Sequence, residues 1–434
     1  MNTPASVRPT PSLRIEELGV QAFRTFKERV LVPFREGRRP AEPISALHGA
    51  SCAGKSNLIA AVGAFFKASE LCLNSPTGTH DVPANTFDPR LPITKRDRFR
   101  MEAPTEIDIR FADQRLLPLR LSAAPQGDAL RYALTFLPPN EAPAPGHVFP
   151  AEKMRPLNDE IRAWLRTWLC EPLGSGSRPF ARLAARDASH ALSTGTPRAL
   201  YPLPSLADEL YRHRTSLDPM ERDLWHRFLV AIRGLPPFEN REIGVEWVDD
   251  AAEIVLEDRG RTVIRFHDLS ASEQQALALA AFSFFSRAAV LAIEYPETHL
   301  DNPMKKALLT LLQRRIDAGR IDQVFLETHE TQFDGPTVLR VFKKNDHYSD
   351  VTRGPSVGEA PADIDKKGRE SGAKQGWVTR DGYTQLPDAM REELHLTLGG
   401  HVWFLKGKSR WEAWPGQELE RLFPDEDTDD RDPE

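Results

Sequence analysis

The chain has 434 residues, enough for a sizeable core and two or three domain-sized units. Lysine and arginine total 57 against 63 aspartate and glutamate, a net charge of −6, which excludes a general basic excess for nucleic acid and leaves only local patches. Three cysteines, no signal-peptide pattern and no apolar run of membrane-spanning length favour a soluble, cytoplasmic protein without membrane contact.

The first predicted elements are two strands of a hairpin, at residues 13–23 and 29–34, with Arg24 near the turn. Residues 44–62 then combine a short apolar strand, a loop at 49–56 and an amphipathic helix. This order and the spacing of glycine, lysine and serine are typical of a phosphate-binding loop.

The residue types in this loop suit a bound nucleotide. Gly49 and Gly54 can take backbone angles that let successive N–H groups surround a phosphate at a helix N-terminus. Lys55 supplies a positive charge for the terminal phosphates, and the Ser56 hydroxyl is placed to bind Mg²⁺. We include the next residue, Asn57, among the nucleotide-binding candidates.

A dense basic run follows at residues 95–100, either a solvated loop or a local contact for DNA. Alternating apolar residues at 105–111, 116–121 and 130–136 predict an antiparallel sheet arm. A proline-rich connector at 138–156 separates this arm from a helical block.

In the helical block, tryptophan and leucine residues share one face of a helix near 161–169. Asp218 and Pro219 predict the start of a second helix, as cap and first helical residue. Neither helix has the heptads of a coiled coil. The pattern next predicts strands at 243–248, 252–257 and 262–266.

A second informative stretch begins with Leu-Ser-Ala-Ser-Glu-Gln-Gln at residues 269–275, which opens an apolar helix. An apolar strand at 289–293 then ends in Glu294-Tyr295-Pro296-Glu297-Thr298-His299-Leu300-Asp301. After a helix at 303–316, a strand at 323–326 ends in Glu327-Thr328-His329. In α/β folds, nucleotide chemistry collects at such carboxyl ends of strands.

These parts, in this order, resemble the ABC-type ATPases of the SMC, RecF and OLD branch over roughly residues 13–345. They are especially similar to the stand-alone ATPases of bacterial defence systems such as Septu and PARIS. The resemblance implies an α/β fold, an ABC-ATPase head with a parallel-sheet core around the P-loop, an antiparallel β arm and an inserted helical subdomain. It also implies ATP and Mg²⁺ as cofactors.

The resemblance implies roles for individual residues. Residues 49–56 match the Walker A loop, Glu294 the Walker B acid that holds Mg²⁺ through water, and His329 the switch histidine. Ser270 matches the signature serine, which contacts the γ-phosphate of ATP on the other subunit, and Asp301 belongs to the D-loop. Arg24 stands where related proteins carry an arginine near the phosphates.

The sequence departs from the family pattern at two places. Ala271 and Ser272 replace the signature glycines, and Tyr295 stands where the family places the glutamate that polarises the attacking water. Tyrosine, with a pKa near ~10, is a poor base at neutral pH. Three possibilities follow: slow turnover, a hydrolytic role for Glu297 or His329, or an ATP-dependent clamp with little hydrolysis.

The expected domains are an N-terminal lobe with Walker A and the β arm at 1–137, a helical insertion at 138–238, a C-terminal lobe at 239–350, and a docking element with an acidic tail at 351–434. OLD nucleases continue into a Toprim domain whose first strand ends in Glu-Gly. Here the comparable strand ends in Lys406-Gly407, so we expect no nuclease domain.

The sequence therefore favours an ATPase subunit of a bacterial anti-phage complex, forming a homodimer or higher oligomer through ATP and controlling a separate effector, a nuclease or toxin. Two alternatives stay open. One is a RecF-like DNA-repair clamp that uses the 95–100 patch. The other is an ATP-bound scaffold with little hydrolysis.

Overall fold

The computed structural model describes two compact units, 1–356 and 357–434. The described residues are 11–35, 41–50, 52–83, 91–94, 97–98, 103–183, 203–248, 250–258, 262–334, 337–344, 348–355, 390, 392, 402–406 and 411–415. The boundary expected at 350/351 falls inside strand β16 (Tyr348–Pro355), so the first unit extends beyond it.

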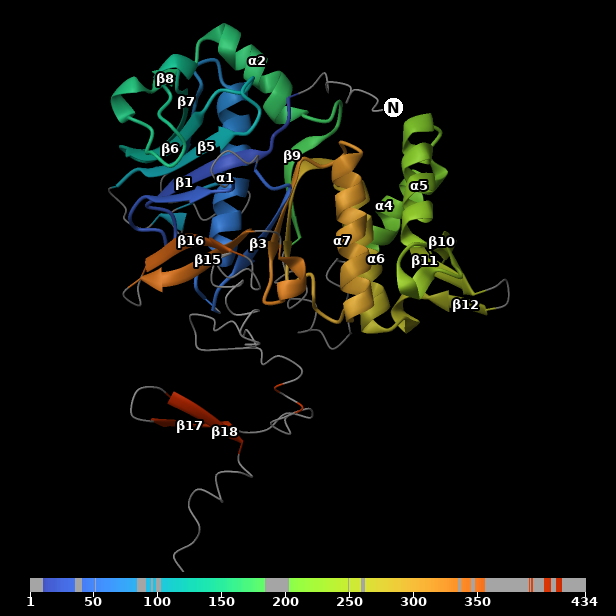
Figure 1. Ribbon diagram of the computed structural model, residues 1–434. Helices are drawn as coiled ribbons and strands as arrows, with labels where there is room; N and C mark the ends of the chain where they lie inside the picture. Colours follow the sequence, from blue (N-terminus) through green and yellow to red (C-terminus); the bar gives the residue numbers. More distant parts are fainter. Residues whose placement is uncertain are drawn as a thin grey trace, which may run out of the picture. The chain divides into compact units, whose positions relative to one another are not determined.

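The first sheet is the antiparallel arm expected from the sequence (Figure 1). Its strand order is β2-β1-β5-β6-β7-β4, and β8 also pairs with β7. The bounds are β1 (Ile15–Gln21), β2 (Val30–Pro33), β4 (Thr79–Pro83), β5 (Thr105–Phe111), β6 (Leu119–Gln126), β7 (Ala129–Phe136) and β8 (Arg155–Pro156). In β7 alternate side chains are buried, which is the period-two pattern that the sequence showed.

The second sheet carries the phosphate-binding loop. Its order is β16-β15-β3-β14-β13-β9, all parallel except β16. The bounds are β3 (Ile44–His48), β9 (Arg178–Leu183), β13 (Ala288–Glu294), β14 (Gln323–Glu327) and β15 (Thr337–Lys344). Strands β13 and β14 are buried along their whole length, which explains their unbroken apolar sequences.

Helix α1 (Lys55–Asn74) touches both sheets and forms the centre of the N-terminal core (Figure 1). Among the described residues it is the one helix long and apolar enough to cross a membrane. Its apolar side chains are instead packed against protein, with Leu58, Phe65 and Phe66 all buried. Helix α2 (Asp159–Cys170) packs on it.

A second apolar core joins the helical segment to the sheet. It includes α4 (Leu203–Thr215), α5 (Pro219–Ile232), α6 (Ala271–Phe285), α7 (Asn302–Asp317) and an antiparallel meander of β10 (Arg241–Val248), β11 (Ala251–Asp258) and β12 (Thr262–Arg265). Phe228 stacks edge-on against Phe284 and Phe285, which fixes α5 on α6. Single 3-10 turns lie at Pro139–Glu141, Ala151–Lys153, Pro236–Phe238, Phe266–Asp268 and Thr331–Phe333.

The segment expected to be a helical insertion, 138–238, contains a strand of the main sheet. Strand β9 lies inside it and pairs in parallel with β13. The sequence missed β9 because it is a short edge strand that includes Pro179, and only alternate residues of it are buried. It also missed α4 and β4.

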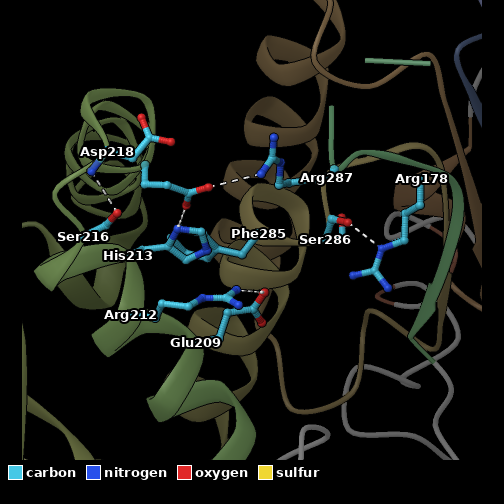
Figure 2. A pocket seen from close by; sticks show the side chains of 11 residues that line it. Arg178, Glu209, Arg212, His213, Ser216, Asp218, Phe285, Ser286 and Arg287 are labelled. Carbon is cyan, nitrogen blue, oxygen red and sulfur yellow. Dashed lines mark hydrogen bonds and ion pairs between the residues drawn. The ribbon is translucent and has the colours of Figure 1, made fainter. Parts of the chain in front are cut away.

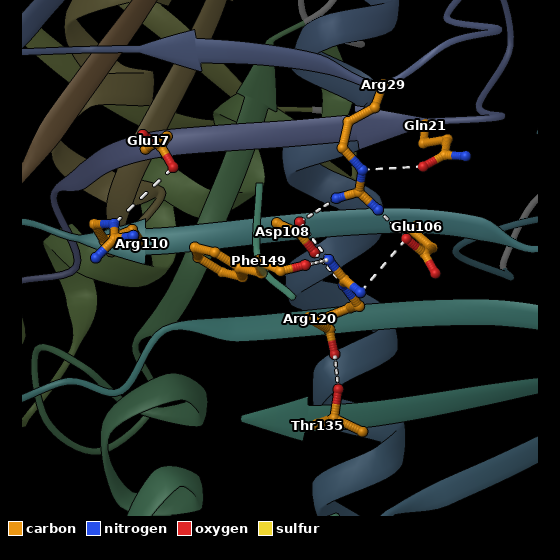
Figure 3. A network of polar contacts seen from close by, with 9 residues as sticks. All are labelled: Glu17, Gln21, Arg29, Glu106, Asp108, Arg110, Arg120, Thr135 and Phe149. Atoms are coloured by element: carbon orange, nitrogen blue, oxygen red, sulfur yellow. Dashed lines mark hydrogen bonds and ion pairs between the residues drawn. The ribbon is translucent and has the colours of Figure 1, made fainter. Parts of the chain in front are cut away.

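A network of buried charges crosses the first sheet on the face covered by the connector (Figure 3). Asp108, which is 2% exposed, accepts hydrogen bonds from Nε and Nη2 of Arg120 at 2.6 and 3.0 Å and also pairs with Arg29. Glu106 pairs with both arginines. The buried Asp108 carboxylate thus compensates the positive charge of two guanidinium groups.

The second unit contains an antiparallel hairpin of β17 (Val402–Lys406) and β18 (Trp411–Pro415). These strands overlap the small element expected at 394–414, and β18 ends one residue beyond it. The acidic tail at 424–434 lies outside the described residues, and the docking role stays a prediction.

Candidate functional site

The loop between β3 and α1 needs glycine at both ends. Gly49 has a φ of 151°, and Gly54, the N-cap of α1, has a φ of 111°. A Cβ at Gly49 would overlap the carbonyl oxygen of Val341 on β15, and one at Gly54 would overlap the Ser349 hydroxyl on β16. Glycine therefore lets the loop lie directly against the two outer strands. Ser51 lies outside the described residues.

In the part of the chain that the structure describes, the N-terminus of α1 has no side-chain cap. Four other helices have a side-chain N-cap, namely Asn158 on α2, Asp218 on α5, Ser270 on α6 and Asp301 on α7. Within the described ranges no side chain caps α1, and its first turn has no acidic residue. Uncapped N–H groups and the positive end of the helix dipole are what a phosphate binds.

Lys55, only 2% exposed, folds back over the loop. Its Nζ donates to the carbonyl oxygens of Gly49 at 2.7 Å and Ala50 at 3.1 Å. The same nitrogen lies 4.0 Å from the Glu327 carboxylate. An ammonium group bonded to neutral carbonyl oxygens gains a stronger partner when a charged phosphate enters the loop.

Arg24 lies against the first turn of α1. Its Nη1 donates to Oδ1 of Asn57 at 3.3 Å and its Nε to Oδ1 of Asp97 at 2.8 Å. The Arg24 backbone has a φ of 49°, held by its N–H bond to the Asp97 carbonyl oxygen at 2.6 Å. The structure therefore brings Arg24 and Asn57 together beside the loop.

Ser349 is a loop contact that the sequence did not indicate. Its Oγ lies 2.6 Å from the carbonyl oxygen of Ala53 and 2.6 Å from the hydroxyl of Thr25. Thr25 in turn accepts a hydrogen bond from the Asn57 amide at 2.9 Å. A local pattern cannot reveal this link, because it depends on β16 pairing with β15 at the edge of the sheet.

Two buried carboxylates meet at the edge of the parallel sheet beside the loop. Strand β14 lies between β3 and β13, so Leu326 pairs with Ala46 and Glu327 pairs with Glu294. The exposed fractions are 3% for Glu294 and 1% for Glu327. The loop and both acids therefore lie at the carboxyl ends of adjacent strands.

Glu294 is bonded to an arginine of the unpredicted strand β9. Nε of Arg182 donates to Oε1 of Glu294 at 2.7 Å, and the Arg182 Nη2 also contacts this oxygen. A charge-assisted, two-nitrogen contact of this kind is strong and directional. Sequence reasoning missed Arg182 because it missed β9.

Glu327, which the sequence placed at a strand end without a role, contacts the loop directly. Ser56 Oγ donates to its Oε2 at 2.7 Å. Burial raises the pKa of Glu327, and the nearby Glu294 adds to this, against the opposing effect of its hydrogen-bond donors and Lys55. Glu327 is the acid nearest to the predicted Mg²⁺ ligand.

Tyr295 is held in an unusual conformation by β14. Its φ is 50°, its N–H donates to the Glu327 carbonyl oxygen at 2.7 Å, and its ring stacks on His329 with centroids 5.5 Å apart. Burial, followed by the negative charge of Glu327, raises the pKa of the Tyr295 hydroxyl above its ordinary value. Tyr295 is therefore a hydrogen-bond donor at neutral pH and not a base.

Glu297 holds the segment that contains His329. Its Oε2 accepts from the Thr328 hydroxyl at 2.8 Å, and its Oε1 accepts from the N–H of His329 at 2.9 Å. With both oxygens engaged, the carboxylate positions the histidine. The structure thus gathers Glu297, Tyr295 and His329 beside the loop.

Asp301 and Ser270 have helix-capping roles. Asp301 accepts from the N–H of Met304 at 2.9 Å at the start of α7. Ser270 is exposed and forms a capping box with Glu273 on α6. None of the described hydrogen bonds of Ser270 reaches the loop of the same chain.

The residues present fit a nucleotide with Mg²⁺. In P-loop sites Mg²⁺ is bound by few protein oxygens together with substrate phosphates, and Ser56 and Glu327 offer such oxygens. Across the described part of the chain no cluster of three or more histidine, cysteine, aspartate or glutamate residues forms a metal cage of its own. An oxygen site completed by phosphate is thus the arrangement these residues suit.

A cavity of about 580 Å³ lies elsewhere, where α4 and α5 meet β9 and the end of α6 (Figure 2). Two of its three arginines donate hydrogen bonds: Arg178 to the Ser286 carbonyl oxygen at 2.7 Å, and Arg287 to Glu221 at 3.1 Å. The third, Arg212, lies 3.9 Å from Glu209. His213 stacks on Phe285, and burial lowers the pKa of His213. This cavity belongs to the junction between the helical segment and the sheet.

The basic patch falls largely outside the described residues, which include only Asp97 and Arg98 from 95–100. Arg98 is 7% exposed and pairs through its backbone with Phe23, so it is not part of an exposed surface for DNA. Asp97 is bonded to Arg24. The two described residues of the patch therefore contact Phe23 and Arg24, beside the phosphate-binding loop.

No family model and no curated protein match the sequence. Among solved structures, the chain is similar to an SMC head bound to the C-terminal winged-helix domain of ScpA, with 17% identity and a TM-score of 0.46 over 79% of this chain and 98% of that chain. An SMC head domain from Thermotoga maritima gives 14% identity and a TM-score of 0.43 over 79% and 99%. An SMC head with an extended coiled coil, bound to the C-terminal domain of ScpA and derived from Pyrococcus furiosus, gives 14% and 0.43 over 82% and 99%. Similarity at this level assigns no activity, which has to come from the geometry of the chain itself.

Proposed function

We propose that this chain is an ABC-type ATPase that binds ATP with Mg²⁺ in the loop at 49–56. The observation that carries the proposal is one shared sheet edge. There, an uncapped helix N-terminus, a buried lysine and two buried carboxylates at the ends of β13 and β14 lie together. These groups supply anion binding, charge compensation and oxygen ligands in one place.

The proposed active unit is two copies of the chain. In one copy, Ser270 is exposed at the start of α6 and bonded within its own first turn. This exposed position lets a phosphate held by a second copy reach the serine. A symmetric pair would contain two such contacts, because a two-fold interface repeats each contact.

We place this ATPase, by the resemblance of its motifs, in a bacterial anti-phage complex where nucleotide-driven association controls a separate nuclease or toxin. A scaffold with little hydrolysis is the second candidate. Two observations favour it. Both oxygens of Glu297 accept hydrogen bonds, from Thr328 and His329, and the raised pKa of Tyr295 keeps its hydroxyl protonated, so neither group stands ready as a base.

Replacing Lys55 by alanine is expected to weaken ATP binding roughly ten- to hundredfold, because a charged hydrogen bond contributes about 1.5–3 kcal/mol. Isothermal titration with ATP and Mg²⁺ measures the change. Lys67→Ala is the matched control, since Lys67 lies on the same helix but is exposed. Equal affinities for the two variants would argue against a phosphate site at this loop.

Ser270→Arg is expected to prevent nucleotide-dependent dimerisation while leaving nucleotide binding by one copy intact. The added side chain would occupy the space of the second copy's phosphate. Sedimentation velocity with a non-hydrolysable ATP analogue and Mg²⁺ measures the dimer, and Met220→Arg, at a residue 73% exposed on α5, serves as control. A wild-type chain that stays monomeric at saturation would rule out the shared site.

A further inference from the structure

Two carboxylates reach the edge beside the loop, and they have different partners. Glu327 accepts a hydrogen bond from the Ser56 hydroxyl at 2.7 Å. Glu294 accepts from the Arg182 guanidinium through two nitrogens. Strand order explains the difference, because β14 lies beside β3 and β13 lies one strand further away. The acid at the end of β14 therefore has direct access to the loop.

The Ser56 and Glu327 oxygens have the separation of two ligands of one Mg²⁺. Magnesium binds oxygens in octahedral geometry, and ligands on adjacent corners lie about 3 Å apart. The 2.7 Å hydrogen bond between Ser56 Oγ and Glu327 Oε2 needs to lengthen only slightly to admit the ion between them. No movement of either strand is required.

The Glu327 carboxylate is also fixed in place. Its Oε2 accepts the hydrogen bond from Ser56, and the Tyr295 N–H donates to the Glu327 carbonyl oxygen at 2.7 Å. The Glu327 side chain is nearly inaccessible to solvent. A carboxylate held by two neighbouring elements is preorganised for an ion, since its orientation needs no further loss of freedom.

We propose that Glu327, and not Glu294, is the carboxylate that binds the Mg²⁺ of the nucleotide together with Ser56. The inference rests on the proposed function, since it requires a nucleotide in the loop. Glu294 then serves as the partner of Arg182, and the Tyr295 N–H helps to fix the end of β14 that carries Glu327. The resemblance placed the metal-binding acid at the end of β13, whereas in this proposal it lies at the end of β14.

The test compares Glu327→Gln with Glu294→Gln, both nearly isosteric. Binding of a non-hydrolysable ATP analogue is titrated in Mg²⁺ and in EDTA, so no turnover is needed. In wild type, Mg²⁺ should strengthen binding. Glu327→Gln should reduce this strengthening at least about tenfold, the scale of losses at groups that support a bound metal. Glu294→Gln should keep most of it, and affinity in EDTA should change little in either variant.

A direct metal measurement accompanies the titration. The electron paramagnetic resonance signal of bound Mn²⁺ with the analogue should be lost in Glu327→Gln and kept in Glu294→Gln. Thermal unfolding establishes that each variant is folded. If Glu327→Gln is not, Glu327→Asp replaces it, because withdrawing the carboxylate by one methylene should weaken the metal effect in the same direction.

The outcomes distinguish a wrong choice of metal-binding carboxylate from a failure of nucleotide binding itself. Loss of the Mg²⁺ effect in Glu294→Gln with its retention in the Glu327 variant would overturn the assignment of the metal carboxylate while leaving nucleotide binding established. A wild-type chain that binds no analogue in either buffer would overturn the proposed function itself. The predicted pattern in both readouts supports Glu327.

Discussion

Replacing Gly49 by alanine is expected to destabilise the fold by about 2–5 kcal/mol and to remove nucleotide binding. The new Cβ would overlap the main-chain carbonyl oxygen of Val341, which cannot rotate away as a side chain can. The φ of 151° is also unfavourable for alanine. Overpacking costs about 1–3 kcal/mol or more, and backbone strain about 1–2 kcal/mol in addition. Urea unfolding and ATP titration measure the two effects.

Gly127→Ala is the matched control for this substitution. Gly127 has a φ of 59°, but a Cβ there would meet no atom within 4 Å. It should show only the backbone cost, about 1 kcal/mol, with unchanged nucleotide affinity. Similar losses of stability for the two variants would mean that contact between the loop and β15 is not what requires glycine at position 49.

Replacing Asp108 by alanine is expected to lower the free energy of unfolding by about 3–5 kcal/mol, the cost of removing one partner from a buried ion network. Without this carboxylate, Arg29 and Arg120 face each other with Glu106 as their remaining shared partner (Figure 3). Urea unfolding measures the change. Nucleotide affinity of the folded variant should be unchanged, because the network lies in the antiparallel arm.

Asp81→Ala is the control, because Asp81 makes the same type of pair with Arg131 at 2.7 Å but in an exposed position. Exposed pairs contribute little to stability because solvent screens them, so the loss should be small. If both variants lost the same free energy, burial would not be the source of the stability of the Asp108 network.

Much of the fold was determined by local sequence. Burial of a strand leaves a pattern in its own segment, either alternating apolar residues or an unbroken apolar run. This pattern predicted five of the observed strands, β1, β5, β7, β13 and β14. The loop at 49–56 was predictable because its glycines, lysine and serine act at short range. The starts of α5 and α6 were predictable since Asp218 and Ser270 cap their own helices. By contrast β9, a short edge strand, left too weak a pattern to recognise.

The partners within the site were decided only by the tertiary structure. The sequence predicted that Glu294 would share the Mg²⁺ with Ser56, but the carboxylate that lies against Ser56 is Glu327. That depends on β14 lying between β3 and β13, a pairing of segments far apart in the chain. The same holds for Arg182 on Glu294 and for Ser349 on the loop. Strand order depends on packing of the whole core. Local sequence patterns therefore could not predict where the acids of the site would lie.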